Sequence, residues 1–187
     1  GINHNGKLKN ALKMIDVAKK SGCSAIKFQT FKADELVQEK KLKHTYISKG
    51  KKISESMNKM FKRYELKEKD WKFISNYCKK KKIIFFSTPQ NVSDLKNLLK
   101  LKVPAIKVGS DDFTNIPLIK EYLKFNLPLI LSTGMTKEED IDNVLKIKNL
   151  DKKKIIFLAC TSEYPTKHEN VNFNKIYSIK NKIKNHL

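Results

Sequence analysis

Short, continuous apolar runs alternate with stretches of helical spacing along most of this chain. The apolar runs fall at residues 25–30, 83–88, 105–110, 127–133 and 154–161. The stretches of helical spacing fall at 7–20, about 67–81, 92–101, 117–125, 137–147 and 173–183. Parallel strands that are buried on both faces have such uninterrupted apolar sequences, and helices connect them. The pattern therefore predicts an α/β protein with a parallel sheet.

The number of strand and helix pairs favours part of a TIM (β/α)8 barrel. If residues 1–3 are counted as the end of a first strand, the chain holds six strands, each followed by a helix. A closed barrel has eight such units and about 250 residues. We therefore expect residues 1–187 to form one partial TIM-barrel catalytic domain, with the start of the first strand and the last two βα units outside the chain.

Other fold and location signals are weak. No G-x-G-x-x-G sequence opens the first helix, so a dinucleotide-binding fold has no support. The longest apolar run is far shorter than the roughly 20 residues that span a membrane, and the first residues lack the apolar core of a signal peptide. A soluble, cytoplasmic protein without a membrane partner is the expectation.

The segment 31–65 interrupts the alternation. It is long, polar and rich in lysine and serine, and no strand or helix pattern stands out in it. Loops of this length in compact domains are usually functional or disordered. We therefore expect a long loop between the strands at 25–30 and 83–88.

The net charge of +21 raises the possibility of a nucleic-acid partner. However, Arg63 is the only arginine, and base recognition favours the planar guanidinium of arginine over lysine. The expectation is that nucleic acid is not a partner, and a basic nucleic-acid-binding domain stays as an alternative. The three cysteines lack a C-x-x-C pair, which favours reduced thiols over a disulfide framework or a thiolate metal site.

Polar groups able to form hydrogen bonds follow each expected strand, at the end where TIM barrels carry their chemistry. They are Asn3 and His4, Lys27 and Gln29, Ser87 and Thr88, Lys107, Ser110 and Asp112, Ser132 and Thr133, and Thr161, Ser162 and Tyr164. Ser and Thr at strand ends also cap helices, which accounts for some of these positions.

Lys27 and Lys107 each lie inside an Ala-Ile-Lys sequence of an expected buried strand. A buried, unpaired ammonium costs several kcal/mol, so each lysine must deprotonate or meet an anion. Three interpretations stay open: Lys107 is paired with Asp111 or Asp112, both lysines bind an anionic substrate that bears phosphate and carboxylate, or one of them forms a Schiff base as in lysine-dependent aldolases. The many hydroxyl groups favour the anionic substrate.

Six motifs together resemble the sialic acid synthase family. They are "GINHNG", "AIKFQTFKADELV", "FFSTP", "IKVGSDDFTNIPLI", "LILSTGM" and "CTSEYPT". Enzymes of this family condense phosphoenolpyruvate with N-acetylmannosamine or a related N-acetylated amino sugar and release phosphate. The "GSDDFTN" sequence is more similar to the legionaminate branch.

The resemblance implies roles for particular residues. Phosphoenolpyruvate would be contacted by Lys27, Thr88, Lys107, Ser110, Ser132 and Ser162. The amino sugar would face Gln29, Asp112 and Tyr164, and the residues expected to be catalytic are Lys107, Lys27 and Asp112. His4 is expected in a first loop near the substrate and not as a metal ligand.

The resemblance also implies parts outside this chain. A divalent metal, Mn or Mg, would polarise the sugar aldehyde, and its two histidine ligands would lie beyond Leu187, so no metal ligand is expected in the chain itself. A catalytic glutamate would lie before Gly1. A C-terminal antifreeze-like domain would cover the active site of the partner subunit in a homodimer. We therefore expect residues 1–187 alone to be inactive.

Overall fold

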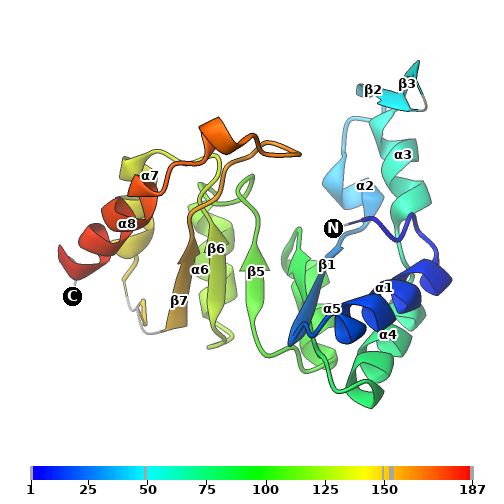
Figure 1. Ribbon diagram of the computed structural model, residues 1–187, viewed down its shortest axis with the longest axis horizontal. Helices are drawn as coiled ribbons and strands as arrows, with labels where there is room; N and C mark the ends of the chain where they lie inside the picture. The colour runs from blue at the N-terminus through cyan, green and yellow to red at the C-terminus, as the bar shows by residue number, and fades with distance from the viewer. Residues whose placement is uncertain (1, 49, 149, 152–153, 186–187) are drawn as a thin grey trace. The chain divides into compact units, whose positions relative to one another are not determined.

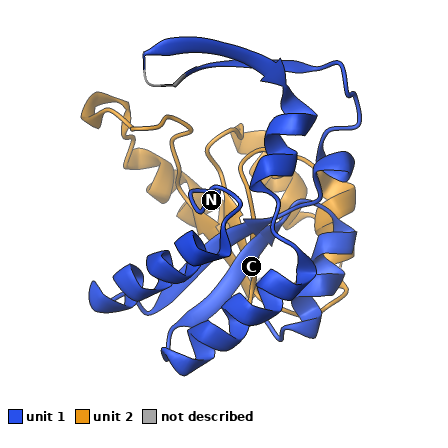
Figure 2. Cartoon of the chain, turned by 90° about the vertical axis from the view of Figure 1, so that its right-hand side faces the viewer, with its two compact units in different colours: residues 1–103 blue, residues 104–187 orange. Residues whose placement is uncertain are grey.

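The computed structural model describes residues 2–48, 50–148, 150–151 and 154–185. It divides into two compact units, residues 1–103 and residues 104–187, which Figure 2 shows in different colours.

The first unit is built on two parallel strands, β1 (Ala25–Thr30) and β4 (Ile84–Pro89). Ala25 pairs with Ile84 and Thr30 with Pro89. The helices α1 (Leu8–Lys20), α4 (Glu68–Lys80) and α5 (Val92–Lys100) lie beside this strand pair (Figure 1). Phe28 of β1 is fully buried and its ring packs against Trp71 and Phe85. Its neighbours along the strand point to the opposite face, because side chains alternate between the two faces of a strand.

The segment that we expected to be a long loop is mostly ordered, so that prediction is wrong. It holds α2 (Ala33–Leu36), an antiparallel hairpin of β2 (Lys43–Ser48) and β3 (Lys51–Ser56), and α3 (Met57–Tyr64). The hairpin projects beyond α3, away from β1 (Figure 1). Its strands are almost entirely polar, so they lack the alternation of apolar and polar residues that marks a half-buried strand.

Side-chain contacts hold this segment together. Buried Asn58 of α3 donates hydrogen bonds to the backbone carbonyls of Ala33 and Val37, both at 3.2 Å. The guanidinium of Arg63 donates to both carboxylate oxygens of Glu55, at 2.5 and 2.6 Å. These contacts join residues distant in sequence, which local patterns do not report.

The second unit contains three parallel strands in the order β5 (Ile106–Val108), β6 (Leu129–Ser132) and β7 (Ile155–Leu158). Its helices are α6 (Ile116–Leu123), α7 (Glu138–Leu145) and α8 (Asn174–Asn185), with a short 3-10 turn at His168–Asn170. Fully buried side chains from both layers form the core. They include Ile119, Tyr122, Leu129, Leu131 and Val144.

The expected elements outside 31–65 are confirmed within a few residues at their ends. The exception is the first strand, because residues 3–6 form a turn and residue 1 lies outside the described residues. Asn5 and Gly6 have φ angles of 52° and 68°, a left-handed conformation that ends an extended chain. The longest described helices have 13 residues, and none in this part of the chain has the length and apolarity to cross a membrane.

Candidate anion-binding site

Lys107 is the best-buried cation among the described residues of the second unit. It lies in the middle of β5, with only 7% of the residue exposed. Its ammonium donates hydrogen bonds to the hydroxyl of Ser132, at 2.6 Å, and to the backbone carbonyl of Val108. Ser132 ends β6, the neighbouring strand, and also accepts a 3.5 Å contact from the thiol of Cys160. The parallel pairing therefore brings a cation from the middle of β5 beside a hydroxyl at the end of β6.

Two further predicted residues lie beside the turn that follows β6. The N–H of Gly134 donates a 3.0 Å hydrogen bond to the hydroxyl of Ser110. A Cβ atom at position 134 would lie 2.8 Å from that hydroxyl oxygen and 2.4 Å from the hydroxyl oxygen of Ser162. A side chain at position 134 would therefore displace one or both serine hydroxyls.

This arrangement is suited to an anion. Hydroxyl groups and an ammonium donate hydrogen bonds that are short and strong when the acceptor is charged. Buried Thr133 is committed elsewhere, because its hydroxyl donates to the carbonyl of Leu158 at 2.9 Å. The second unit thus brings together four of its six predicted site residues, Lys107, Ser110, Ser132 and Ser162.

The two aspartates after β5 occupy different surroundings. A Cβ atom at Gly109 would lie 2.1 Å from Oδ1 of Asp111, so this carboxylate turns back over the glycine. Asp112 is half-buried and accepts a long hydrogen bond, 3.5 Å, from the side-chain amide of Asn115. Burial, with the carboxylate of Asp111 as a smaller cause, raises the pKa of Asp112. A raised pKa brings this carboxyl closer to the range in which it exchanges a proton with a substrate.

The first unit holds a smaller group of predicted residues. The ammonium of Lys27 donates to the hydroxyl of Thr88 and to the carbonyl of Phe28, each at 3.3 Å. Gln29 pairs with Thr88 across β1 and β4. All three side chains belong to the face opposite Phe28, because Lys27 and Gln29 alternate with it along β1. An ammonium, a hydroxyl and an amide thus lie near one another at the end of this strand pair.

Comparison with known proteins assigns the chain to a family. Residues 14–187 match the NeuB family. This chain belongs to the NeuB family. An N,N'-diacetyllegionaminic acid synthase from Campylobacter jejuni is 37% identical over 98% of the chain and 56% of its own length. An N-acetylneuraminate-9-phosphate synthase from Drosophila melanogaster is 32% identical over 89% of the chain and 45% of its own length.

A solved structure supports the fold of this NeuB-family chain. The N-acetylneuraminic acid synthetase of Leptospira borgpetersenii, crystallised with citrate, has a TM-score of 0.82 and 32% identity over 97% of the chain and 59% of that structure. The expected α/β class, with part of a TIM-type barrel, is confirmed. The chain spans about half the length of the curated relatives that it matches.

Tyr164 lies on the surface of this NeuB-family chain. It is 96% exposed and precedes Pro165 through a cis peptide bond. Ser162 is also exposed, although its hydroxyl lies close to Gly134. The role of Tyr164 toward an amino sugar stays a prediction.

His4 is part of the core in this NeuB-family chain. Its ring is fully buried beside Phe28 and Trp71, with centroids 6.0 and 6.2 Å away, and Nδ1 accepts a hydrogen bond from the N–H of Gly6 at 3.1 Å. Burial lowers the pKa of His4 to about 4, so the ring is neutral at pH 7. Nε2 has no hydrogen-bond partner among the described residues. The packing assigns His4 to the hydrophobic core of the first unit.

A metal does not fit the residues described here. Among them, no three His, Cys, Asp or Glu side chains gather in a way that could hold a metal ion. The metal implied by the family resemblance therefore stays a prediction about residues elsewhere in the protein, and no catalytic step below depends on it.

Proposed function

We propose that the protein containing this chain is a nonulosonic acid synthase, which condenses phosphoenolpyruvate with an open-chain N-acetylated amino sugar and releases phosphate. The observation that carries this proposal is the buried ammonium of Lys107 beside the hydroxyl of Ser132, next to the close group of Ser110, Gly134 and Ser162. Phosphoenolpyruvate carries its phosphate and its carboxylate on the same carbon, so it needs several donors in a small volume. Membership of the NeuB family supports the same assignment.

The reaction makes one carbon-carbon bond and breaks one carbon-oxygen bond. The methylene carbon of phosphoenolpyruvate attacks the aldehyde carbon of the sugar, whose oxygen takes up a proton. Water adds to the neighbouring carbon, which still carries the phosphate oxygen, and gives up a proton. Phosphate then leaves with its bridging oxygen and takes up the proton of the new hydroxyl, and the 2-keto acid remains. Positive charge must develop on the phosphoenolpyruvate while both of its anionic groups stay bound.

In this scheme Lys107 holds the phosphate or carboxylate, and Ser132 orients the ammonium. A buried ammonium interacts with an anion more strongly than an exposed one, because little water screens the pair. Lys27 and Thr88 supply a second ammonium and hydroxyl, and Asp112 is proposed to exchange a proton with the sugar. Gln29, Ser110, Ser162 and Tyr164 are proposed to contact substrate as the resemblance implies.

The amino sugar is proposed to be of the legionaminate type. The "GSDDFTN" motif is more similar to that branch, and the relative from Campylobacter jejuni named above is an N,N'-diacetyllegionaminic acid synthase. Mn or Mg as the metal, a homodimer and a cytoplasmic location are carried forward with this proposal.

A Schiff-base aldolase that uses Lys107 or Lys27 is the competing enzyme, and isotope labelling separates the two. Phosphoenolpyruvate labelled with 18O in its bridging oxygen should transfer the label to inorganic phosphate, and release should require the amino sugar. An aldolase would instead leave a borohydride-stable adduct with a keto substrate. Adduct formation without sugar-dependent phosphate release contradicts the synthase proposal. Salt-sensitive duplex binding that is indifferent to Lys107→Ala would favour the nucleic-acid alternative.

A further inference from the structure

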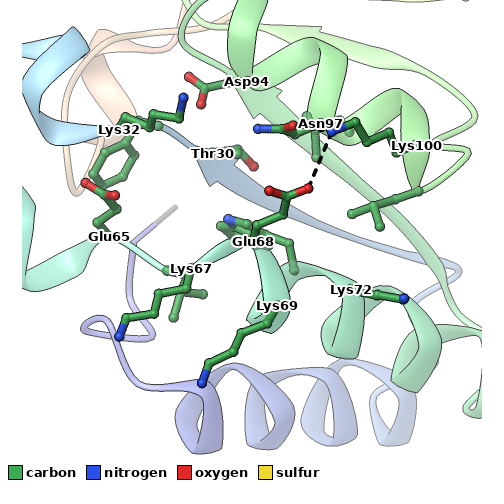
Figure 3. Close-up of a pocket in the computed structure, with 15 residues that line it drawn as sticks. Thr30, Lys32, Glu65, Lys67, Glu68, Lys69, Lys72, Asp94, Asn97 and Lys100 are labelled. Carbon is green, nitrogen blue, oxygen red and sulfur yellow. Dashed lines mark hydrogen bonds and ion pairs between the residues drawn. The ribbon is translucent and has the colours of Figure 1, made fainter.

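A cavity lies within the first unit. Its lining includes none of the predicted site residues Lys27, Gln29 and Thr88. It has a volume of about 580 Å³ and lies between the first turns of α4, the helix α5 and the end of β1 (Figure 3). Ligand pockets are commonly of this size. Its apolar lining includes Leu66, Trp71 and Leu98, all at least 94% buried. The cavity can therefore accommodate the apolar body of a small molecule.

Asp94 supplies an unusual polar group to this lining. It is 2% exposed, and its Oδ2 has no hydrogen-bond partner among the described residues. Such a buried, unpaired oxygen costs free energy, which a donor from outside the protein would recover. Burial, with the carboxylate of Glu35 as the next cause, raises the pKa of Asp94 to about 7. Nearby cations therefore do not offset the cost of burying the ionised carboxylate.

Charged groups of both signs line the cavity: Lys32, Lys67, Lys69, Lys72 and Lys100, with Glu65, Glu68 and Asp94. Lys32 lowers the pKa of Asp94 in part, and its ammonium is paired with Glu35 at 3.0 Å. Figure 3 shows Glu68 and Asn97 pointing toward the middle of the cavity, whereas Lys67 and Lys69 point away. Glu68 is paired with Lys100 at 3.5 Å, but both side chains are about two-thirds exposed. An exposed pair of this kind contributes little and separates easily. Acidic groups are thus available to a cation that enters.

We propose that this cavity binds a small organic ammonium with an apolar body, which places its ammonium against Asp94 and its body against Leu66, Trp71 and Leu98. Glu68 adds a second negative charge, and the ligand competes with Lys100 for it. The proposal is independent of the phosphoenolpyruvate reaction, because the cavity is formed by residues assigned no role there. It concerns binding only, with no chemical step.

Titration of the purified, full-length protein with phenethylamine, followed by calorimetry, tests the proposal. Phenethylamine stays protonated from pH 6 to pH 8, while Asp94 passes from mostly neutral to mostly ionised. We therefore expect affinity to rise by about tenfold over this range, with a proton released at the lower pH. The neutral analogue 2-phenylethanol should bind at least tenfold more weakly than the amine at pH 8.

Variants sharpen this test. Asp94→Asn should remove at least tenfold of the affinity at pH 8 together with its pH dependence. Asp140→Asn is the matched control, because Asp140 is the third residue of α7 as Asp94 is of α5 and lies outside the cavity. Lys100→Met should bind the amine several-fold more tightly, since it removes the competitor for Glu68.

The carboxyl carbon of Asp94, observed by NMR in the unsubstituted protein, gives a measurement that does not depend on the folding of a variant. The pKa of Asp94 should fall when phenethylamine binds. Absence of binding at millimolar amine, an affinity that is constant or falls from pH 6 to pH 8, or equal losses in Asp94→Asn and Asp140→Asn would each overturn the proposal.

Discussion

The N–H of Gly134 donates a 3.0 Å hydrogen bond to the hydroxyl of Ser110, and no space for a side chain remains between this glycine and Ser162. Gly134→Ala should therefore displace one or both serines by several tenths of an ångström. We expect the KM for phosphoenolpyruvate to rise more than tenfold, with a loss of roughly 1–3 kcal/mol in the free energy of unfolding. Steady-state kinetics and urea unfolding measure the two effects.

Gly109→Ala is the control for this substitution. Its Cβ would meet only the carboxylate of Asp111, which is exposed and can rotate away. The KM should change less than threefold. An equal effect of both alanines on KM would mean that the contact with Ser110 and Ser162 does not position the substrate.

Lys107→Met tests the charge at the centre of the site. Methionine keeps much of the volume and removes the ammonium, so the fold should persist while kcat/KM falls by about 10²–10³. Lys120→Met, at an exposed position of α6, controls for the loss of a positive charge and should retain activity. Sugar-dependent phosphate release at the normal rate in Lys107→Met would rule out the proposed role of this ammonium.

Much of this site could be predicted from the sequence, because its chemistry conflicts with its surroundings. A lysine within an apolar strand requires a partner, and the structure provides the hydroxyl of Ser132 for Lys107 and that of Thr88 for Lys27. The order of strands and helices could also be predicted from the sequence, because buried parallel strands have uninterrupted apolar sequences. Tyr164 carried no such conflict, and its exposure could not be foreseen.

The structure of residues 31–65 could not be predicted by the same means. The hairpin has almost no apolar residues, and α3 is held by Asn58 and by the pair of Arg63 with Glu55, which are contacts across turns and strands. Asp94 lies in the first turn of a helix, a common place for an acidic residue. Its functional interest comes only from burial and from the unpaired oxygen, which no local pattern reports.

Asn58→Ala should destabilise the first unit. The substitution removes the amide donor from the buried carbonyl of Val37 and one of two donors from that of Ala33, which keeps the N–H of Val37 at 3.0 Å. Each unsatisfied buried group costs about 1–3 kcal/mol, and we expect the lower end because α2 can shift toward water. Asn97→Ala, in α5, is the control and should cost less. Urea unfolding decides, and an Asn58→Ala protein as stable as wild type would show that the carbonyls find other donors.

The neutral, buried ring of His4 predicts a loss of stability in acid. Its pKa is about 4 in the folded protein and 6.5 in the unfolded chain, so the unfolded chain binds more protons between these values. Stability is therefore fully present above about pH 6.5 and is lost as the pH falls toward 4. We expect a loss of roughly 1–2 kcal/mol in the free energy of unfolding between pH 7 and pH 5. His4→Phe should remove this dependence, whereas exposed His168→Phe should leave it, as measured by urea unfolding at pH 7 and pH 5.

Asp94 predicts a pH dependence of the opposite sign. Its pKa is about 7 in the folded protein and 3.8 in the unfolded chain, so the folded protein binds more protons between pH 4 and pH 7. The contribution to stability is full below about pH 4 and is lost as the pH rises through 7, by roughly 2–4 kcal/mol. Asp94→Asn should remove this slope, and phenethylamine should restore stability to the wild-type protein at pH 8, because a ligand that binds only the folded state stabilises it. If the free energy of unfolding of Asp94→Asn depends on pH as it does in the wild type, another group titrates. The buried oxygen of Asp94 would then not destabilise the fold.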